Sequence, residues 1–216
     1  MPTKIKISIL MFALLFLAGT AQAYGPPSWA GQGWQTPSFT GTSLTDSEKA
    51  DVLHMREEEK LARDVYITLG EKWGAAVFSN ISNSEQRHMD AVGSLITYYG
   101  LSDPVADKGV GEFASTEMQT LYDQLVATGS QSLADAYRVG ATIEDLDIYD
   151  LDNALARTSN PDLTLVFQHL VSGSENHIRA FTSMLSNLGE TYQAQYISSE
   201  RLDEILSSSW NRGRRW

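Results

Sequence analysis

Three glutamates and two histidines stand in apolar stripes that repeat with helical spacing, and these residue types can bind a metal ion. They are Glu59, Glu85, His88, Glu144 and His177. Glu85 and His88 are three residues apart, so both side chains can reach one ion from the same face of a helix. A carboxylate or imidazole that points into an apolar core needs a partner, and several that converge in a helical bundle commonly share a cation. The pattern therefore predicts a metal site.

The composition restricts which ligands such a site can use. The chain has no cysteine, which excludes thiolate metal sites, iron–sulfur clusters, disulfides and thiol nucleophiles. Any metal must be held by oxygen and by imidazole nitrogen. The formal net charge is −11, with 27 Asp and Glu against 16 Lys and Arg, which argues against a general nucleic-acid-binding protein.

The start of the chain predicts export. Lys4 and Lys6 precede an apolar run at 7–17, and small residues at Ala21 and Ala23 suit signal peptidase, so residues 1–23 are expected to be a cleaved signal peptide. We expect a periplasmic or secreted protein without stable membrane insertion after cleavage. The rest divides into a disordered Gly-, Pro- and aromatic-rich leader at 24–43, a helical domain at 44–207 and a basic aromatic tail at 208–216.

The first predicted helix of this domain carries one of the candidate ligands. A capping box begins it at Thr45, and the helical pattern continues to Gly70. Glu59 is the acid on its apolar face. Its neighbours Glu57 and Glu58 are rotated by roughly 100° per residue and are expected at the side or in solvent.

The second predicted helix carries the Glu-x-x-His pair. It covers about 77–99, with Glu85 and His88 on the apolar face. A long connection with its own short helix, at about 116–127, follows it. A connection of this length allows the next long helix to run parallel to the second rather than to turn back.

The third predicted long helix contributes a second isolated acid. It begins near Ser132 and has Glu144 on its apolar face. Asp147, one turn later, can share that side. Asp145 and Asp150 are expected in solvent.

The fourth predicted long helix supplies the second histidine. Asn160 followed by Pro161 is a strong start signal, and the helix should continue to about Gly189 with His177 on its apolar face. Short accessory helices are expected at 151–156 and 194–206.

These motifs together resemble the ferritin-like superfamily, and more narrowly the domain family known as DUF2202. The residues that carry the resemblance are MREEEKLARDVY (55–66), SEQRHMDAV (84–92), GSQSLADAYRVGATIEDL (129–146) and NHIRAF (176–181). The stretch ARDVY is similar to the ARNRY stretch of rubrerythrins. The resemblance covers roughly 44–206 and implies an all-α fold, a ferritin-like four-helix bundle with a long crossover between helices 2 and 3 and short accessory helices.

The ferritin-like pattern implies a carboxylate-bridged pair of metal ions, held by one Glu from each of two helices and Glu-x-x-His from each of the other two. On this pattern Glu59 and Glu144 are the single acids, and Glu85 with His88 is the first complete pair. In the second pair His177 is present, but Ser174 stands where the pattern has Glu. Candidates for a sixth ligand are Asp147 and Glu175.

The resemblance implies a di-iron or di-manganese centre that reacts with oxygen or peroxide. Two iron ions suit the carboxylate and imidazole set best, with manganese or zinc as alternatives. Tyr66 has either a redox or hydrogen-bonding role beside the metals or a place in the core with a bonded hydroxyl. Without cysteine the chain has no built-in rubredoxin-like electron donor.

Two other functions remain open. One is a metal-binding or sequestering module without turnover. The other is a metal-free structural or interaction bundle, in which the acids and histidines pair with Arg63 and other core polar groups. A homodimer is compatible with each of these functions.

Overall fold

The computed structural model describes residues 38–208, and this part of the chain is all-α. The predicted signal peptide, most of the predicted leader and nearly all of the predicted tail lie outside it. Six helices and no strands are found between residues 38 and 208, and none of these helices is long and apolar enough to cross a membrane. The helices are α1 (Asp46–Trp73), α2 (Ala76–Tyr98), α3 (Thr116–Gly129), α4 (Leu133–Arg157), α5 (Pro161–Asn187) and α6 (Ser199–Ser207).

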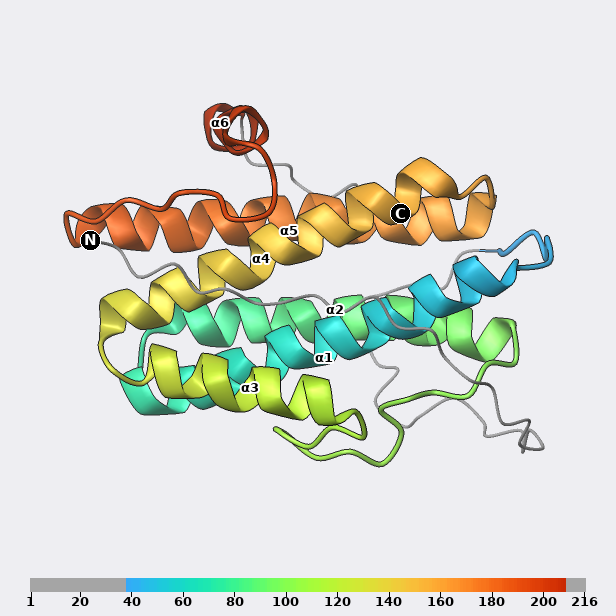
Figure 1. Ribbon diagram of the computed structural model, residues 1–216, viewed down its shortest axis with the longest axis horizontal. Helices are drawn as coiled ribbons and strands as arrows, with labels where there is room; N and C mark the ends of the chain where they lie inside the picture. Colours follow the sequence, from blue (N-terminus) through green and yellow to red (C-terminus); the bar gives the residue numbers. More distant parts are fainter. Residues whose placement is uncertain (1–37, 209–216) are drawn as a thin grey trace.

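The four longest helices form a helical bundle of two antiparallel pairs (Figure 1). α1 packs on α2, α4 packs on α5, and the pairs meet where α1 contacts α4 and α2 contacts α5. α4 runs in the same direction as α2, and α3 lies along α1 and α4 (Figure 1). α6 packs on α5 and is seen almost end-on in that view.

The apolar core is divided into two clusters along the bundle. One surrounds Tyr66, Phe78 and Phe181, and the other surrounds Leu95 and Phe167. On α1, α2 and α5 the candidate ligands come between the residues of one cluster and those of the other, and on α4 Glu144 lies between Ile143 and Ile148 of the first cluster. The candidate ligands therefore form a polar layer inside an otherwise apolar interior.

The helix starts follow the local signals in the sequence. The Glu48 amide donates to Thr45 Oγ1 at 3.2 Å and the Thr45 amide donates to Glu48 Oε2 at 2.9 Å, which is the predicted capping box. Asn160 caps α5, with Pro161 at its first position. These two caps fix where the first and fourth long helices enter the bundle.

Three helices differ in extent from the prediction. α1 continues past Gly70 and ends at Trp73, with Gly74 in the left-handed conformation at φ 64°. Gly70 is instead a point of close approach, because a Cβ there would lie 3.1 Å from the Cβ of Phe78 on α2. α4 is one helix through 151–156 rather than two, and α6 begins only at Ser199.

The prediction that Asp145 lies in solvent is wrong, because this residue is fully buried. Its carboxylate accepts hydrogen bonds from the Ile197 amide at 2.9 Å, the Gln195 amide at 2.5 Å and the Tyr192 hydroxyl at 2.7 Å. These bonds hold the segment before α6 in a non-helical conformation, which explains why α6 is shorter than expected. Glu58 is buried as well and not in solvent.

Residues 38–43, which were assigned to the leader, lie against the bundle. The Thr40 and Gly41 amides donate to the carboxylate of Asp162, at 2.9 and 3.3 Å, and Tyr99 donates to it at 2.6 Å.

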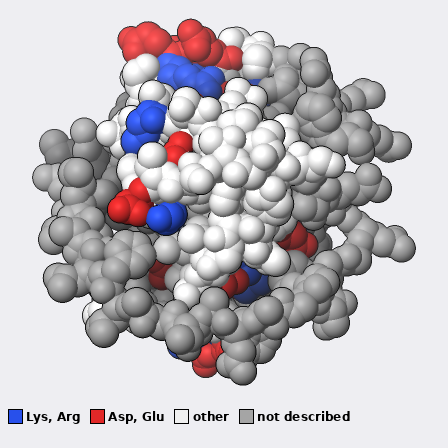
Figure 2. Space-filling view, turned by 90° about the vertical axis from the view of Figure 1, so that its right-hand side faces the viewer, with Lys and Arg blue, Asp and Glu red and all other residues white. Residues whose placement is uncertain are grey.

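At the end of the bundle where α1 begins, the visible described surface is mostly uncharged, with charged side chains of both signs mainly around it (Figure 2).

Candidate metal centre

All five of the candidate ligands meet in one buried cluster. α1 supplies Glu59, α2 supplies Glu85 and His88, α4 supplies Glu144 and α5 supplies His177. The most exposed of them, His177, is only 7% exposed. The five residues that the helical periodicity placed on apolar faces therefore face one another inside the bundle.

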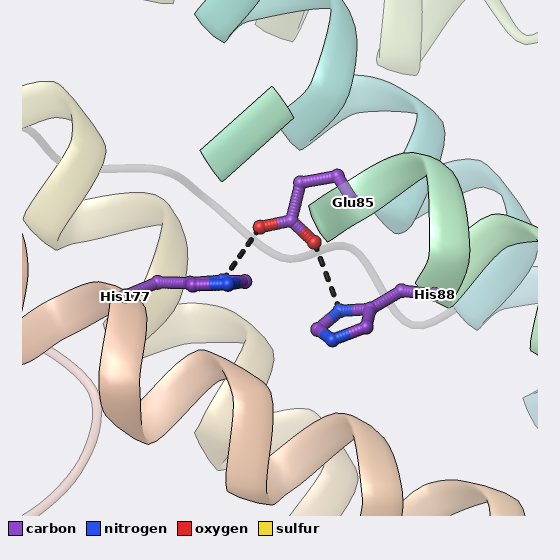
Figure 3. Close-up of side chains that lie close together, drawn as sticks. All are labelled: Glu85, His88 and His177. Atoms are coloured by element: carbon purple, nitrogen blue, oxygen red, sulfur yellow. Dashed lines mark ion pairs between the residues drawn. The ribbon is translucent and has the colours of Figure 1, made fainter. Parts of the chain in front are cut away.

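Glu85 lies between the two imidazoles, with one oxygen toward each (Figure 3). Its Oε2 is 2.9 Å from Nδ1 of His88, and its Oε1 is 2.7 Å from Nδ1 of His177. The two rings are 5.3 Å apart between centroids. A carboxylate in this position can bind one ion with each oxygen.

The two remaining glutamates lie on either side of this group. Glu59 Oε2 is 3.1 Å from Nδ1 of His88, and Glu144 Oε2 is 3.4 Å from Nδ1 of His177. The carboxylates and imidazoles thus alternate, so each imidazole has carboxylate oxygens from two helices beside it. Such a set of oxygen and nitrogen donors suits iron, manganese and zinc.

Tyr66 extends the cluster into the apolar core. Its hydroxyl donates to Glu144 Oε1 at 2.6 Å, and its ring packs on Phe181 with centroids 5.1 Å apart. Burial and the charge of Glu144 raise the pKa of the Tyr66 hydroxyl well above its ordinary value. The tyrosine is therefore a core residue whose hydroxyl also orients a candidate ligand.

Asp147 and Ser174 meet at the position where the expected glutamate is missing. The Ser174 hydroxyl donates to Asp147 Oδ2 at 2.5 Å, and both side chains are buried. The other oxygen of Asp147, Oδ1, has no hydrogen-bond partner among the described residues. Asp147 on α4 can thus supply the carboxylate that Ser174 on α5 does not.

Glu175, the other candidate for a sixth ligand, is directed elsewhere. It forms ion pairs with Arg201 at 2.8 Å and with Arg179 at 3.5 Å. These contacts tie α5 to α6. Asp147 is therefore the better candidate for the sixth ligand.

Four candidate ligand atoms in the cluster are buried without a hydrogen-bond partner within residues 38–208. They are Glu59 Oε1, Glu85 Oε1, Asp147 Oδ1 and His177 Nδ1, one from each long helix. Glu85 Oε1 and His177 Nδ1 are close enough for an ion pair but are not aligned for a hydrogen bond. Unpaired buried polar atoms are rare and costly, and a cation among these four would give each of them a partner.

The pKa values of the clustered groups also favour a bound cation. Burial raises the pKa of Glu59 to about 8 and that of Glu144 to about 7. Although burial opposes it, the charges of Glu59 and Glu85 raise the pKa of His88 well above its ordinary value, and those of Glu85 and Glu144 raise the pKa of His177 to about 9. The cluster therefore retains protons near neutral pH, and a bound metal ion would replace them.

Sequence reasoning missed Gly173, which gives His88 its space. A Cβ at this position would lie 2.3 Å from His88 Nε2, so only glycine lets α5 pass this close to the imidazole. His169, one turn earlier, packs its ring edge-on to His88. A glycine in the interior of α5 beside Ser174 was the available signal.

Arg63 does not pair with the candidate ligands. Its guanidinium donates to Asp64 at 2.8 Å and to Gln86 at 2.6 Å. In the metal-free alternative, Arg63 was expected to pair with the clustered acids. It pairs instead with Asp64 and Gln86.

The chain belongs to the DUF2202 family. Residues 48–209 match the family described as "Uncharacterized protein domain (DUF2202)", close to the 44–206 expected from the motifs. Over 170 residues the chain is 50% identical to the uncharacterized protein MJ0754 of Methanocaldococcus jannaschii, which covers 79% of this chain and 92% of that protein. The crystal structure of the hypothetical protein MJ0754 from Methanococcus jannaschii is similar, with a TM-score of 0.79 and 48% identity, over 81% of this chain and 99% of that one.

Proposed function

We propose that this protein is an exported, ferritin-like metalloprotein whose buried cluster holds two iron ions, or two manganese ions, and reacts with oxygen or peroxide. The arrangement that supports it is one single acid on each of α1 and α4, Glu-x-x-His on α2 and a histidine on α5, around one buried point. Export is proposed from the pattern of residues 1–23.

The observation that carries the proposal is the set of four buried atoms, one from each long helix, that make no hydrogen bond within residues 38–208. A purely structural polar cluster is expected to satisfy its hydrogen bonds internally. Here carboxylate and imidazole atoms from four helices converge but leave donor atoms unused, as they would around cations.

The residues divide the work in a simple way. Glu85 would hold both ions, together with Glu59 and His88 on one side and Glu144 and His177 on the other. Asp147 would supply the carboxylate that Ser174 cannot. Bound iron would supply redox chemistry toward oxygen or peroxide.

The protein's own groups would control protons and water at the site. The Tyr66 hydroxyl donates a hydrogen bond to Glu144 Oε1, with 2.6 Å between the two oxygens, and keeps that carboxylate in one orientation. The cluster is closed off by the apolar residues on both sides along the bundle. Burial of this kind keeps bulk water away from the donors.

The test is the metal content of the mature protein after expression with iron, manganese and zinc. We expect two ions per chain in the wild type and loss of metal in Glu59→Gln and Glu85→Gln. Glu57→Gln, two residues from Glu59 and outside the cluster, is the matched control and should keep both ions. A metal-free wild type would refute the proposal.

A second candidate, a metal-binding module without turnover, is favoured by one contact. Because Ser174 donates to Asp147 Oδ2, only one oxygen of that carboxylate is left for an ion. One bound ion per chain with no consumption of peroxide would support this candidate. Two ions and an absorption band that appears on oxidation would favour the redox centre.

A further inference from the structure

A second group of metal-ligand side chains lies where α1 and α4 run side by side (Figure 1). His54 and Glu58 are one turn apart on α1, and Asp150 faces them from α4. His54 Nε2 is 3.4 Å from Glu58 Oε1 and 3.9 Å from Asp150 Oδ2. One donor atom from each residue falls within 4.8 Å of the other two.

This group differs from an ordinary acidic patch because two of its carboxylate oxygens are buried and make no hydrogen bond within residues 38–208. Glu58 is 8% exposed, and its Oε2 has no hydrogen-bond partner within the described chain. Asp150, which was expected in solvent, is half-buried, and its Oδ2 makes no hydrogen bond between residues 38 and 208. The His54 side chain, in contrast, is 44% exposed, so the group opens to solvent through its imidazole.

The chemistry of the group fits a divalent transition-metal ion. One imidazole and two carboxylates are the donor set that Mn²⁺, Fe²⁺ and Zn²⁺ accept, and further positions can be filled by water on the exposed side. Two buried carboxylate oxygens without partners are costly, and an ion bound between them would remove that cost.

One acid of each group lines the same small cavity. Glu58 and Asp147 both line it, and its other walls are apolar side chains of α1, α3 and α4. Asp147 is the acid that meets Ser174 in the inner centre, and Glu58 precedes Glu59 in the chain. The two carboxylates are therefore the polar groups that the outer group and the inner one present to this cavity.

We propose that His54, Glu58 and Asp150 form an outer site for a divalent transition-metal ion, and that the ion passes from there to the inner centre by way of Glu58 and Asp147. The passage rests on the proposed function of the inner centre, whereas the outer site itself does not. The exposed imidazole of His54 captures the ion beside the buried Glu58 and the half-buried Asp150, and Glu58 lines the cavity that Asp147 shares.

The site is tested by titration of the metal-free full-length mature protein with Mn²⁺, with free Mn²⁺ followed by its electron paramagnetic resonance signal. Asp150→Asn should bind one ion fewer per chain than the wild type, and so should His54→Ala. Asp152→Asn is the matched control, since the same change is made on the same helix two residues away at a side chain that pairs with Arg201. It should bind as many ions as the wild type.

The passage is tested by the rate at which the remaining ions bind. In Asp150→Asn we expect loading of the inner centre to slow about tenfold, because a charged site that concentrates cations near their destination is lost. Binding of as many ions in Asp150→Asn as in the wild type, or loss of one ion with unchanged loading of the others, would overturn the proposal. Glu85→Gln separates the two proposals, because a failure of the inner centre would still leave one ion that Asp150→Asn removes.

Discussion

Replacing Gly173 with alanine should disable the proposed metal centre while leaving the fold intact. The new Cβ would lie 2.3 Å from Nε2 and 2.5 Å from Cε1 of His88, whereas ordinary contact begins at 3.4 Å. The imidazole must therefore move by about 1 Å in a closely packed interior. A shift of this size carries Nδ1 away from Glu59 and Glu85, which lie 3.1 and 2.9 Å from it.

The effect on stability should be small because two terms oppose each other. Overpacking of this kind costs about 1–3 kcal/mol, and alanine gains about 1 kcal/mol over glycine in a helix interior. A net loss of roughly 0–2 kcal/mol is expected for the metal-free protein in urea unfolding. Metal affinity should fall at least tenfold, since a ligand can no longer reach its position.

Gly93→Ala is the matched control for this substitution. It makes the same change inside α2, where the nearest atom to the new Cβ is Arg56 Nη1 at 3.4 Å, an ordinary contact. This variant should keep its metal and be equally stable or more stable than the wild type. Wild-type metal affinity in Gly173→Ala would refute the argument that α5 leaves room for a ligating His88.

Three further outcomes follow from the same contacts. Asp147→Asn should weaken binding of one of the two ions about tenfold or more with little change in folding stability, and equal affinity for both ions in isothermal titration calorimetry would show that Asp147 is no ligand. The metal-free protein should lose folding stability between about pH 7 and 9. The pKa of Glu59 is raised to about 8 and that of His177 to about 9, so the folded chain holds protons that the unfolded chain releases. A free energy of unfolding in urea that stays constant or rises with pH over this range would contradict the prediction. Asp145→Ala should lower the free energy of unfolding in urea by about 2 kcal/mol or more, because it removes charge-assisted hydrogen bonds to the segment before α6. The control Asp152→Ala, at the surface, should change it by less than about 0.5 kcal/mol. Equal effects of the two substitutions would contradict the role given to Asp145.

The sequence predicted the parts of this structure that depend on local periodicity. Thr45 and Asn160 begin helices because their side chains bond amides two or three residues away, which needs no knowledge of the fold. The apolar stripes place Glu59 and His177 inward for the same reason, since each helix repeats its faces on its own. Local rules were therefore enough to find the five clustered residues.

Features that arise only from packing between distant segments were missed. Asp145 is buried by bonds to residues 192–197, about fifty positions later, and nothing in its own helix signals them. Glu58 is buried against His54 and Asp150 because α4 happens to cross α1 there. The role of Gly173 likewise depends on how closely α5 approaches α2.

The most direct test of the central claim is anomalous X-ray diffraction from crystals of the iron-loaded protein, measured on both sides of the iron absorption edge. We expect two iron peaks inside the cluster, both in contact with Glu85, with His88 beside one and His177 beside the other. Crystals that show no iron peak there, with Glu85 still paired directly to the two histidines, would contradict the claim that this cluster is a metal centre.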